Sequence, residues 1–150
     1  VYACMTLGAF AVAVAAGRPG AQVDAIADLA GLGFRRPLLG AAMAVFMLSL
    51  AGIPPLAGFV GKLYLFGAAV DAGFVWLTVI GVLNSVVSVY YYAGVLVQMY
   101  MVEGGAEEAP ARRPGFAVAL ALVLTAGATV VAGIVPSALL QVAAASFAGM

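Results

Sequence analysis

Apolar residues are gathered into long runs along the chain, and short segments rich in glycine, proline and charge separate these runs. Four runs predict helices, at about residues 1–17, 37–72, 74–102 and 115–136. A helix needs about 20 mainly apolar residues to cross a hydrocarbon core of roughly 30 Å. The pattern therefore predicts an all-α fold, a polytopic transmembrane helical bundle that forms a single membrane domain over residues 1–150.

The second run is too long for one straight crossing and too short for two crossings with a turn. As one helix, residues 37–72 would measure about 54 Å. Pro54 and Pro55 remove two backbone donors and clash with the preceding turn, so we expect the helix to break there. A single interrupted crossing puts all five arginines in connections on one side of the membrane, whereas two crossings would divide them. The positive-inside tendency thus favours four crossings, with cytoplasmic arginine-bearing loops and the C-terminus outside.

Composition and charge restrict the possible functions. The chain is 66% apolar and 8% charged, whereas soluble domains average about 25% charged residues. A soluble enzyme or a nucleic-acid-binding protein is therefore excluded. Six basic residues balance six acidic ones, histidine is absent, and Cys4 is the only cysteine. We accordingly expect no metal site, no cofactor site and no nucleic-acid partner in this chain, and the lipid bilayer is its expected environment.

Lys62 is the only lysine, and it lies within an apolar run. It precedes the outer end of that run by about 15 Å of helix, which places it near the middle of the membrane. A charge at that depth costs about 2.5–3.5 kcal/mol. The carbonyl end of the half-helix before Pro54 would favour an ammonium group nearby. We interpret Lys62 as a catalytic proton relay on a broken helix; the alternative is a structural ion pair with a residue outside this sequence.

Other polar residues inside the runs are candidates for a proton path. Asn84 lies near the depth of Lys62, where it could hold water, and Ser88 follows four residues later on the same helix face. Asp71, at the exit end, is a candidate acceptor, although such a carboxylate is more often a solvated helix end. The remaining hydroxyls more often bond to their own helix or join neighbouring helices: Thr6, Ser49, Thr125 and Thr129.

The segment 49–64, SLAGIPPLAGFVGKLY, resembles the second broken helix of the antiporter-like subunits of respiratory complex I, the NADH-quinone oxidoreductase. The ending GKLY at 61–64 is most similar to the subunit N branch of that family. Further similarity lies in MTLGAF at 5–10, SVYYY at 88–92 and QMYM at 98–101. These segments follow one another in the order of the family.

The resemblance implies a piece of a longer subunit in a bacterial inner membrane, covering its last four helices and beginning within a helix that starts before Val1. Lys62 matches the family's lysine on the broken helix, which belongs to a proton-conducting axis. The partners implied are other membrane subunits of the complex, and quinone only indirectly. The complex as a whole uses NAD and quinone, but this chain carries no redox centre. One departure is that Ala93 and Gly94 stand where subunit N often has an arginine.

The leading hypothesis is a proton-translocating membrane subunit of NADH-quinone oxidoreductase. One alternative is an Mrp-type cation/proton antiporter subunit, in which the same broken helix and Lys62 would support exchange of sodium or potassium ions. The other alternative is a structural membrane subunit without a transport site, in which Lys62 forms an inert pair. Replacing Lys62 separates the structural alternative from the leading hypothesis, and sodium-dependent transport in the absence of NADH and quinone would favour the Mrp-type alternative.

Overall fold

The computed structural model describes residues 1–17, 23, 25–104 and 115–137, and these residues form helices and no strands. The predicted all-α fold is therefore confirmed for the described part of the chain. The elements are α1 (Tyr2–Ala16), the 3-10 helix η1 (Ile26–Leu29), α2 (Leu32–Arg35), α3 (Pro37–Ala51), α4 (Ala57–Asp71), α5 (Val75–Met101) and α6 (Phe116–Ile134).

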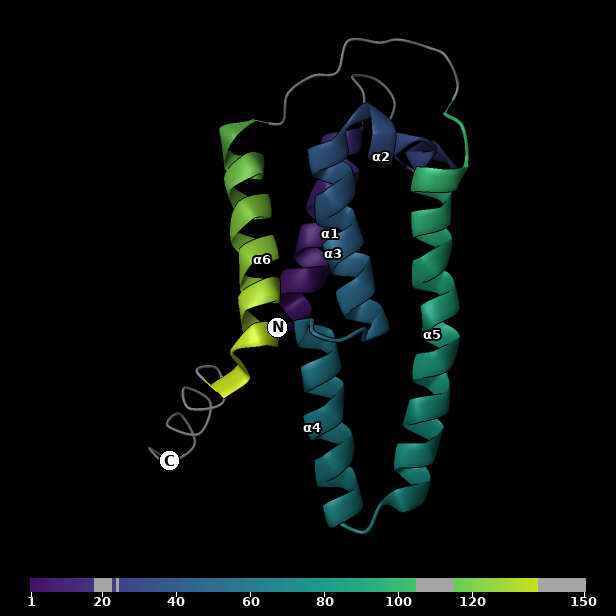
Figure 1. The fold of residues 1–150 in the computed structure, drawn as a ribbon, viewed down its shortest axis with the longest axis vertical. Coiled ribbons are helices and arrows are strands. Elements are labelled where there is room, and N and C mark those ends of the chain that lie inside the picture. Colours follow the sequence, from purple (N-terminus) through teal and green to yellow (C-terminus); the bar gives the residue numbers. More distant parts are fainter. Residues whose placement is uncertain (18–22, 24, 105–114, 138–150) are drawn as a thin grey trace.

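Where the sequence predicts one interrupted helix, the structure has α3 and α4, separated by residues 52–56. Figure 1 shows α4 continuing in the direction of α3, after which α5 runs back along both of them. By length and composition, α5 and α6 could each cross a membrane alone, whereas α1 and α3 are apolar but shorter. Four crossings therefore remain a prediction. Arg18, Arg112 and Arg113, on which the predicted sidedness partly depends, lie outside the described residues.

The core lies around α3, which packs against α1, α5 and α6. Phe46 of α3 is fully buried, as are Val12 of α1 and Met99 of α5. Gly8 of α1 makes room for the Phe46 ring, because a Cβ atom at Gly8 would lie 2.2 Å from Phe46 Cζ. The helix α4 and the N-terminal half of α5 form a hairpin that lies beyond this core. Most of the side chains of this hairpin are exposed in this chain.

A second packed region, here called the arginine end, joins the end of α1 to α2, the start of α3 and the end of α5. Arg36 Nη1 donates a hydrogen bond of 2.6 Å to the carbonyl of Ala15, in the last turn of α1. The ring of Tyr100 fills the space left by two glycines. A Cβ atom would lie 2.3 Å from Tyr100 Cε1 at Gly33, and 3.0 Å from its Oη at Gly40. Small residues thus allow close packing at this end.

Candidate functional site

The site is built on the C-terminal end of α3. Gly52 ends the helix with a left-handed backbone, at φ 89° and ψ 39°, a conformation that glycine adopts without steric strain. The amide of Gly52 donates to the carbonyls of Leu48, at 3.1 Å, and Ser49, at 3.0 Å. A helix ends with four carbonyls that lack partners within it. The carbonyls of Leu50 and Ala51 therefore need donors from elsewhere.

Lys62, on α4, supplies those donors. Its Nζ donates to the carbonyl of Leu50 at 3.1 Å and to that of Ala51 at 3.0 Å. An ammonium group at a helix C-terminus also interacts favourably with the negative end of the helix dipole. Gly52 leaves room for this contact, since a Cβ atom there would lie 3.1 Å from Nζ. The ammonium group thus lies at the carbonyl end of the first half-helix, the end that is expected from the sequence to favour it.

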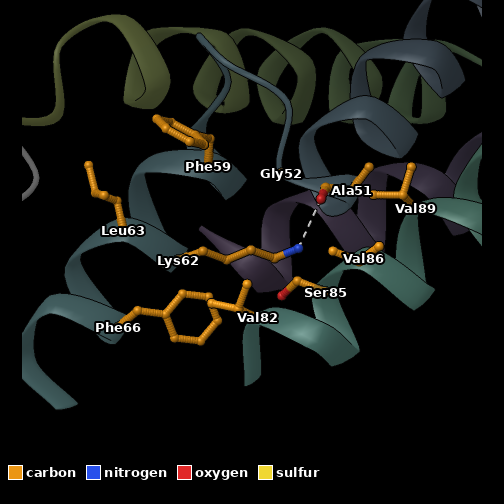
Figure 2. A pocket seen from close by; sticks show the side chains of 10 residues that line it. All are labelled: Ala51, Gly52, Phe59, Lys62, Leu63, Phe66, Val82, Ser85, Val86 and Val89. Carbon is orange, nitrogen blue, oxygen red and sulfur yellow. Dashed lines mark hydrogen bonds between the residues drawn. The ribbon is translucent and has the colours of Figure 1, made fainter. Parts of the chain in front are cut away.

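Lys62 extends into a pocket of about 240 Å³ between the end of α3, α4 and α5. Figure 2 shows its side chain reaching toward the main-chain oxygen of Ala51, with Ser85 of α5 on the other side of the ammonium group. The remaining lining is mainly apolar: Gly52, Phe59, Leu63, Phe66, Val82, Val86 and Val89. The sequence predicts a buried lysine, but Lys62 is half-buried in this chain because the pocket is open.

The other predicted path residues do not line this pocket. Asn84 is exposed, and Asp71 is the exposed last residue of α4. Ser88 is half-buried, and its hydroxyl donates to the carbonyl of Ser85 at 2.7 Å. Ser85 faces the pocket instead, while its hydroxyl donates to the carbonyl of Gly81 at 2.9 Å. The roles of Asn84, Ser88 and Asp71 stay predictions, and Ser85 joins them as a candidate.

Pro54 and Pro55 lie in the segment between α3 and α4, and α6 packs against the far side of that segment. A Cβ atom at Gly133 of α6 would lie 2.2 Å from the carbonyl oxygen of Pro55 and 2.7 Å from the amide nitrogen of Ala57. This close approach requires glycine in α6. The segment between α3 and α4 is therefore packed against α6, and the start of α4 is packed there as well.

Within residues 1–17, 23, 25–104 and 115–137, no group of three or more His, Cys, Asp or Glu side chains could hold a metal ion. The chemistry that the pocket offers is that of an amine, a hydroxyl and main-chain carbonyls in apolar surroundings. Such a set can hold a cation or pass a proton.

Comparison with known proteins places this geometry in a family. The family described as NADH:quinone oxidoreductase/Mrp antiporter, TM, matches residues 1–88, which include α1 to α4 and Lys62. The chain belongs to this family. Its membrane character thus follows from the family as well as from its apolar helices.

Individual relatives of this family carry the similarity over nearly the whole chain. A protein of Trichlorobacter lovleyi named NADH-quinone oxidoreductase subunit N is 54% identical over 142 residues, which is 95% of this chain and 29% of that protein. A protein of Solibacter usitatus named NADH-quinone oxidoreductase subunit N 1 is 46% identical over 99% of this chain and 31% of its own length. The predicted resemblance to subunit N is confirmed.

A solved structure shares the fold. A chain of respiratory complex I from Thermus thermophilus, with bound aureothin, matches with a TM-score of 0.73 and 32% identity, over 91% of this chain and 31% of that chain. These matches cover most of the present chain, but the chain spans only about three tenths of the length of each of these relatives. Its helices have the arrangement of the matched part of that chain.

Proposed function

We propose that this chain is part of a proton-translocating membrane subunit of an NADH-quinone oxidoreductase, and that Lys62 relays the proton. The observation that carries the proposal is the Lys62 ammonium group on the carbonyls of Leu50 and Ala51, at the interruption between two helices. The names of the relatives support the assignment of this chain to that complex. NAD and quinone are then used elsewhere in it, and other membrane subunits are the partners of this one.

The proposal includes a single interrupted crossing made of α3 and α4. Each has 15 residues, or about 22 Å, so neither alone spans a core of roughly 30 Å. Their common direction supports their joint use as one crossing (Figure 1). With α1, α5 and α6 this gives four crossings in a bacterial inner membrane. The arginine-bearing loops are cytoplasmic and the C-terminus lies outside.

In the proposed mechanism, protonated Lys62 rests on the C-terminal carbonyls of α3. A positive charge that approaches from another helix drives the proton from Nζ to a neighbouring water, and the neutral amine is later protonated again from the other side. The neutral amine is held less tightly by the carbonyls, because the attraction between charge and helix dipole is lost. Ser85 lies across the pocket from the amine. Asn84 and Ser88 on the same helix are further candidates for holding water, and Asp71 is the candidate acceptor at the exit end.

The test replaces Lys62 in the full-length subunit within the assembled complex. Lys62→Ala is expected to reduce NADH-driven proton transport through this subunit by about a hundredfold, a typical contribution of a positioned acid–base group. Lys62→Arg is expected to be as inactive, because arginine keeps its charge but does not release its proton. Proton uptake by inverted membrane vesicles, measured with a pH-sensitive dye and divided by NADH oxidised, gives the readout.

Gly61→Ala is the matched control, because a Cβ atom at Gly61 would have no neighbour within 4 Å. Normal pumping by an assembled Lys62→Ala complex would refute the proton-relay role and favour the structural alternative. Sodium- or potassium-dependent proton exchange in vesicles without NADH and quinone, abolished by the same substitution, would favour the Mrp-type alternative instead.

A further inference from the structure

Among the described residues, the Ser49 hydroxyl differs from five other helix hydroxyls in what it bonds, and from the buried Thr6 hydroxyl, which has no hydrogen-bond partner there. The hydroxyls of five residues each donate to a carbonyl three or four residues earlier in the chain: Thr78, Ser85, Ser88, Thr125 and Thr129. Ser49 is fully buried, and its Oγ bonds two other helices. It donates to Met5 Sδ of α1 at 2.8 Å and accepts from the Gly58 amide of α4 at 3.0 Å.

The bond from Gly58 satisfies a donor that helix geometry leaves open. Gly58 is in the first turn of α4, where amides have no partner within the helix. Gly58 is buried, so water does not readily replace Ser49 as acceptor. The two backbones are also in close contact, since a Cβ atom at Gly58 would lie 1.7 Å from the Ser49 carbonyl oxygen.

Ser49 and Lys62 connect the same two helix ends. Gly58 and Lys62 are four residues apart, so they lie on one face of α4. Along that face, Gly58 meets Ser49, and Lys62 meets the two residues that follow Ser49, Leu50 and Ala51. The connection through Ser49 involves no ionisable group, whereas the connection through Lys62 depends on a charge.

We infer that the Ser49 hydroxyl is a positioning group for Lys62: it holds the start of α4 against the end of α3, so that the amine returns to the same two carbonyls after each loss of its proton. This inference rests on the proposed proton relay. Without the Ser49 bond, the start of α4 would be held only through packing and through the bond whose strength changes with each proton.

The test compares Ser49→Ala and Ser49→Cys in the full-length subunit within the complex, with Thr129→Val as the control. Thr129 is an equally buried hydroxyl, but it bonds only to its own helix. Ser49→Ala is expected to lower protons pumped per NADH through this subunit about fivefold, because it leaves a buried amide unsatisfied. Ser49→Cys, which keeps a weak acceptor, should recover part of the loss. Thr129→Val should pump normally.

A double-substitution cycle separates positioning from general damage. If Ser49 acts through Lys62, Ser49→Cys and Ser49→Ala cause no further loss of pumping in a Lys62→Ala background. An additional loss there, or equal pumping by wild type and both Ser49 variants, would overturn the inference. If Ser49→Ala does not assemble, the Ser49→Cys variant decides alone, since wild-type pumping by it also overturns the inference. Normal pumping by Lys62→Ala would instead overturn the proposed relay itself.

Discussion

Two cations among the described residues lie at the C-terminus of a long α-helix, at opposite parts of the bundle. At the arginine end, Arg36 donates to the Ala15 carbonyl of α1. At the interruption, Lys62 donates to the Leu50 and Ala51 carbonyls of α3. In both places a side chain from elsewhere in the chain satisfies carbonyls that the helix cannot satisfy itself, and complements the helix dipole.

The surroundings of the two cations differ. Around Arg36 the helices are in close contact, with the Tyr100 ring packed on Gly33 and Gly40. Lys62 instead lies in an open pocket with apolar walls. Arginine remains charged in proteins, whereas lysine can lose its proton when its surroundings change. A cationic side chain on the C-terminal carbonyls of a helix therefore makes a permanent contact where the side chain is always charged. The same contact is reversible where the side chain can become neutral.

The largest expected effect comes from forcing apart the two helices at the lysine. Gly58→Ala would place a Cβ atom 1.7 Å from the Ser49 carbonyl oxygen, where only backbone movement can relieve the clash. We expect a loss of about 3 kcal/mol or more in stability, seen as loss of assembled complex in membranes. Gly61→Ala on the same helix meets open space and should assemble normally. Equal assembly of both variants would contradict the close backbone contact between α3 and α4.

A smaller effect is expected from Gly52→Ala, which changes the residue that ends α3 but leaves the Lys62 ammonium group in place. The left-handed backbone at Gly52 costs about 1–2 kcal/mol for alanine, and the added Cβ atom would lie 3.1 Å from Lys62 Nζ. Both the thermal stability of the complex and its pumping per NADH should fall. Gly94→Ala is the control, because a Cβ atom there has no neighbour within 4 Å. A fall in stability with unchanged pumping would separate Gly52 from the proposed relay.

The smallest effect is expected at the arginine end. Arg36→Met removes the donor to Ala15 and should lower stability by about 1 kcal/mol, a typical value for one hydrogen bond. Pumping per NADH by the assembled complex should not change, since Arg36 only caps a helix. Arg36→Lys keeps a cation and should restore most of the stability. Melting of the purified complex and vesicle pumping provide the two readouts, and reduced pumping by Arg36→Met would remove the contrast between the two ends.

Local chemistry allowed part of the site to be predicted from the sequence. Two consecutive prolines predict a break in the helix, and the structure has separate helices α3 and α4 on either side of them. Lys62 is identified as a candidate because it is the only lysine and lies in an apolar run. The choice among the polar residues of α5 was harder. Asn84 and Ser85 are neighbours in sequence, and which of them lines the pocket depends on how α5 is rotated against α4. That rotation is set by packing between helices, such as the Phe66 ring on Gly81.

Ser49 shows a second limit of sequence reasoning. A serine inside an apolar helix most often bonds to its own helix, and five other hydroxyls in this chain bond to carbonyls of that kind. The bond to Gly58 depends on the path that the chain takes through residues 52–56. Periodicity does not describe that path, because no regular element forms there.

The contact of Gly133 with the interruption has a consequence for biogenesis. The ribosome makes α3, the interruption and α4 well before α6, yet Gly133 of α6 is what covers the backbone from Pro55 to Ala57 on one side. Exposed peptide groups are unfavourable in lipid. The backbone between α3 and α4 is therefore shielded on this side only after α6 has been made and has entered the membrane.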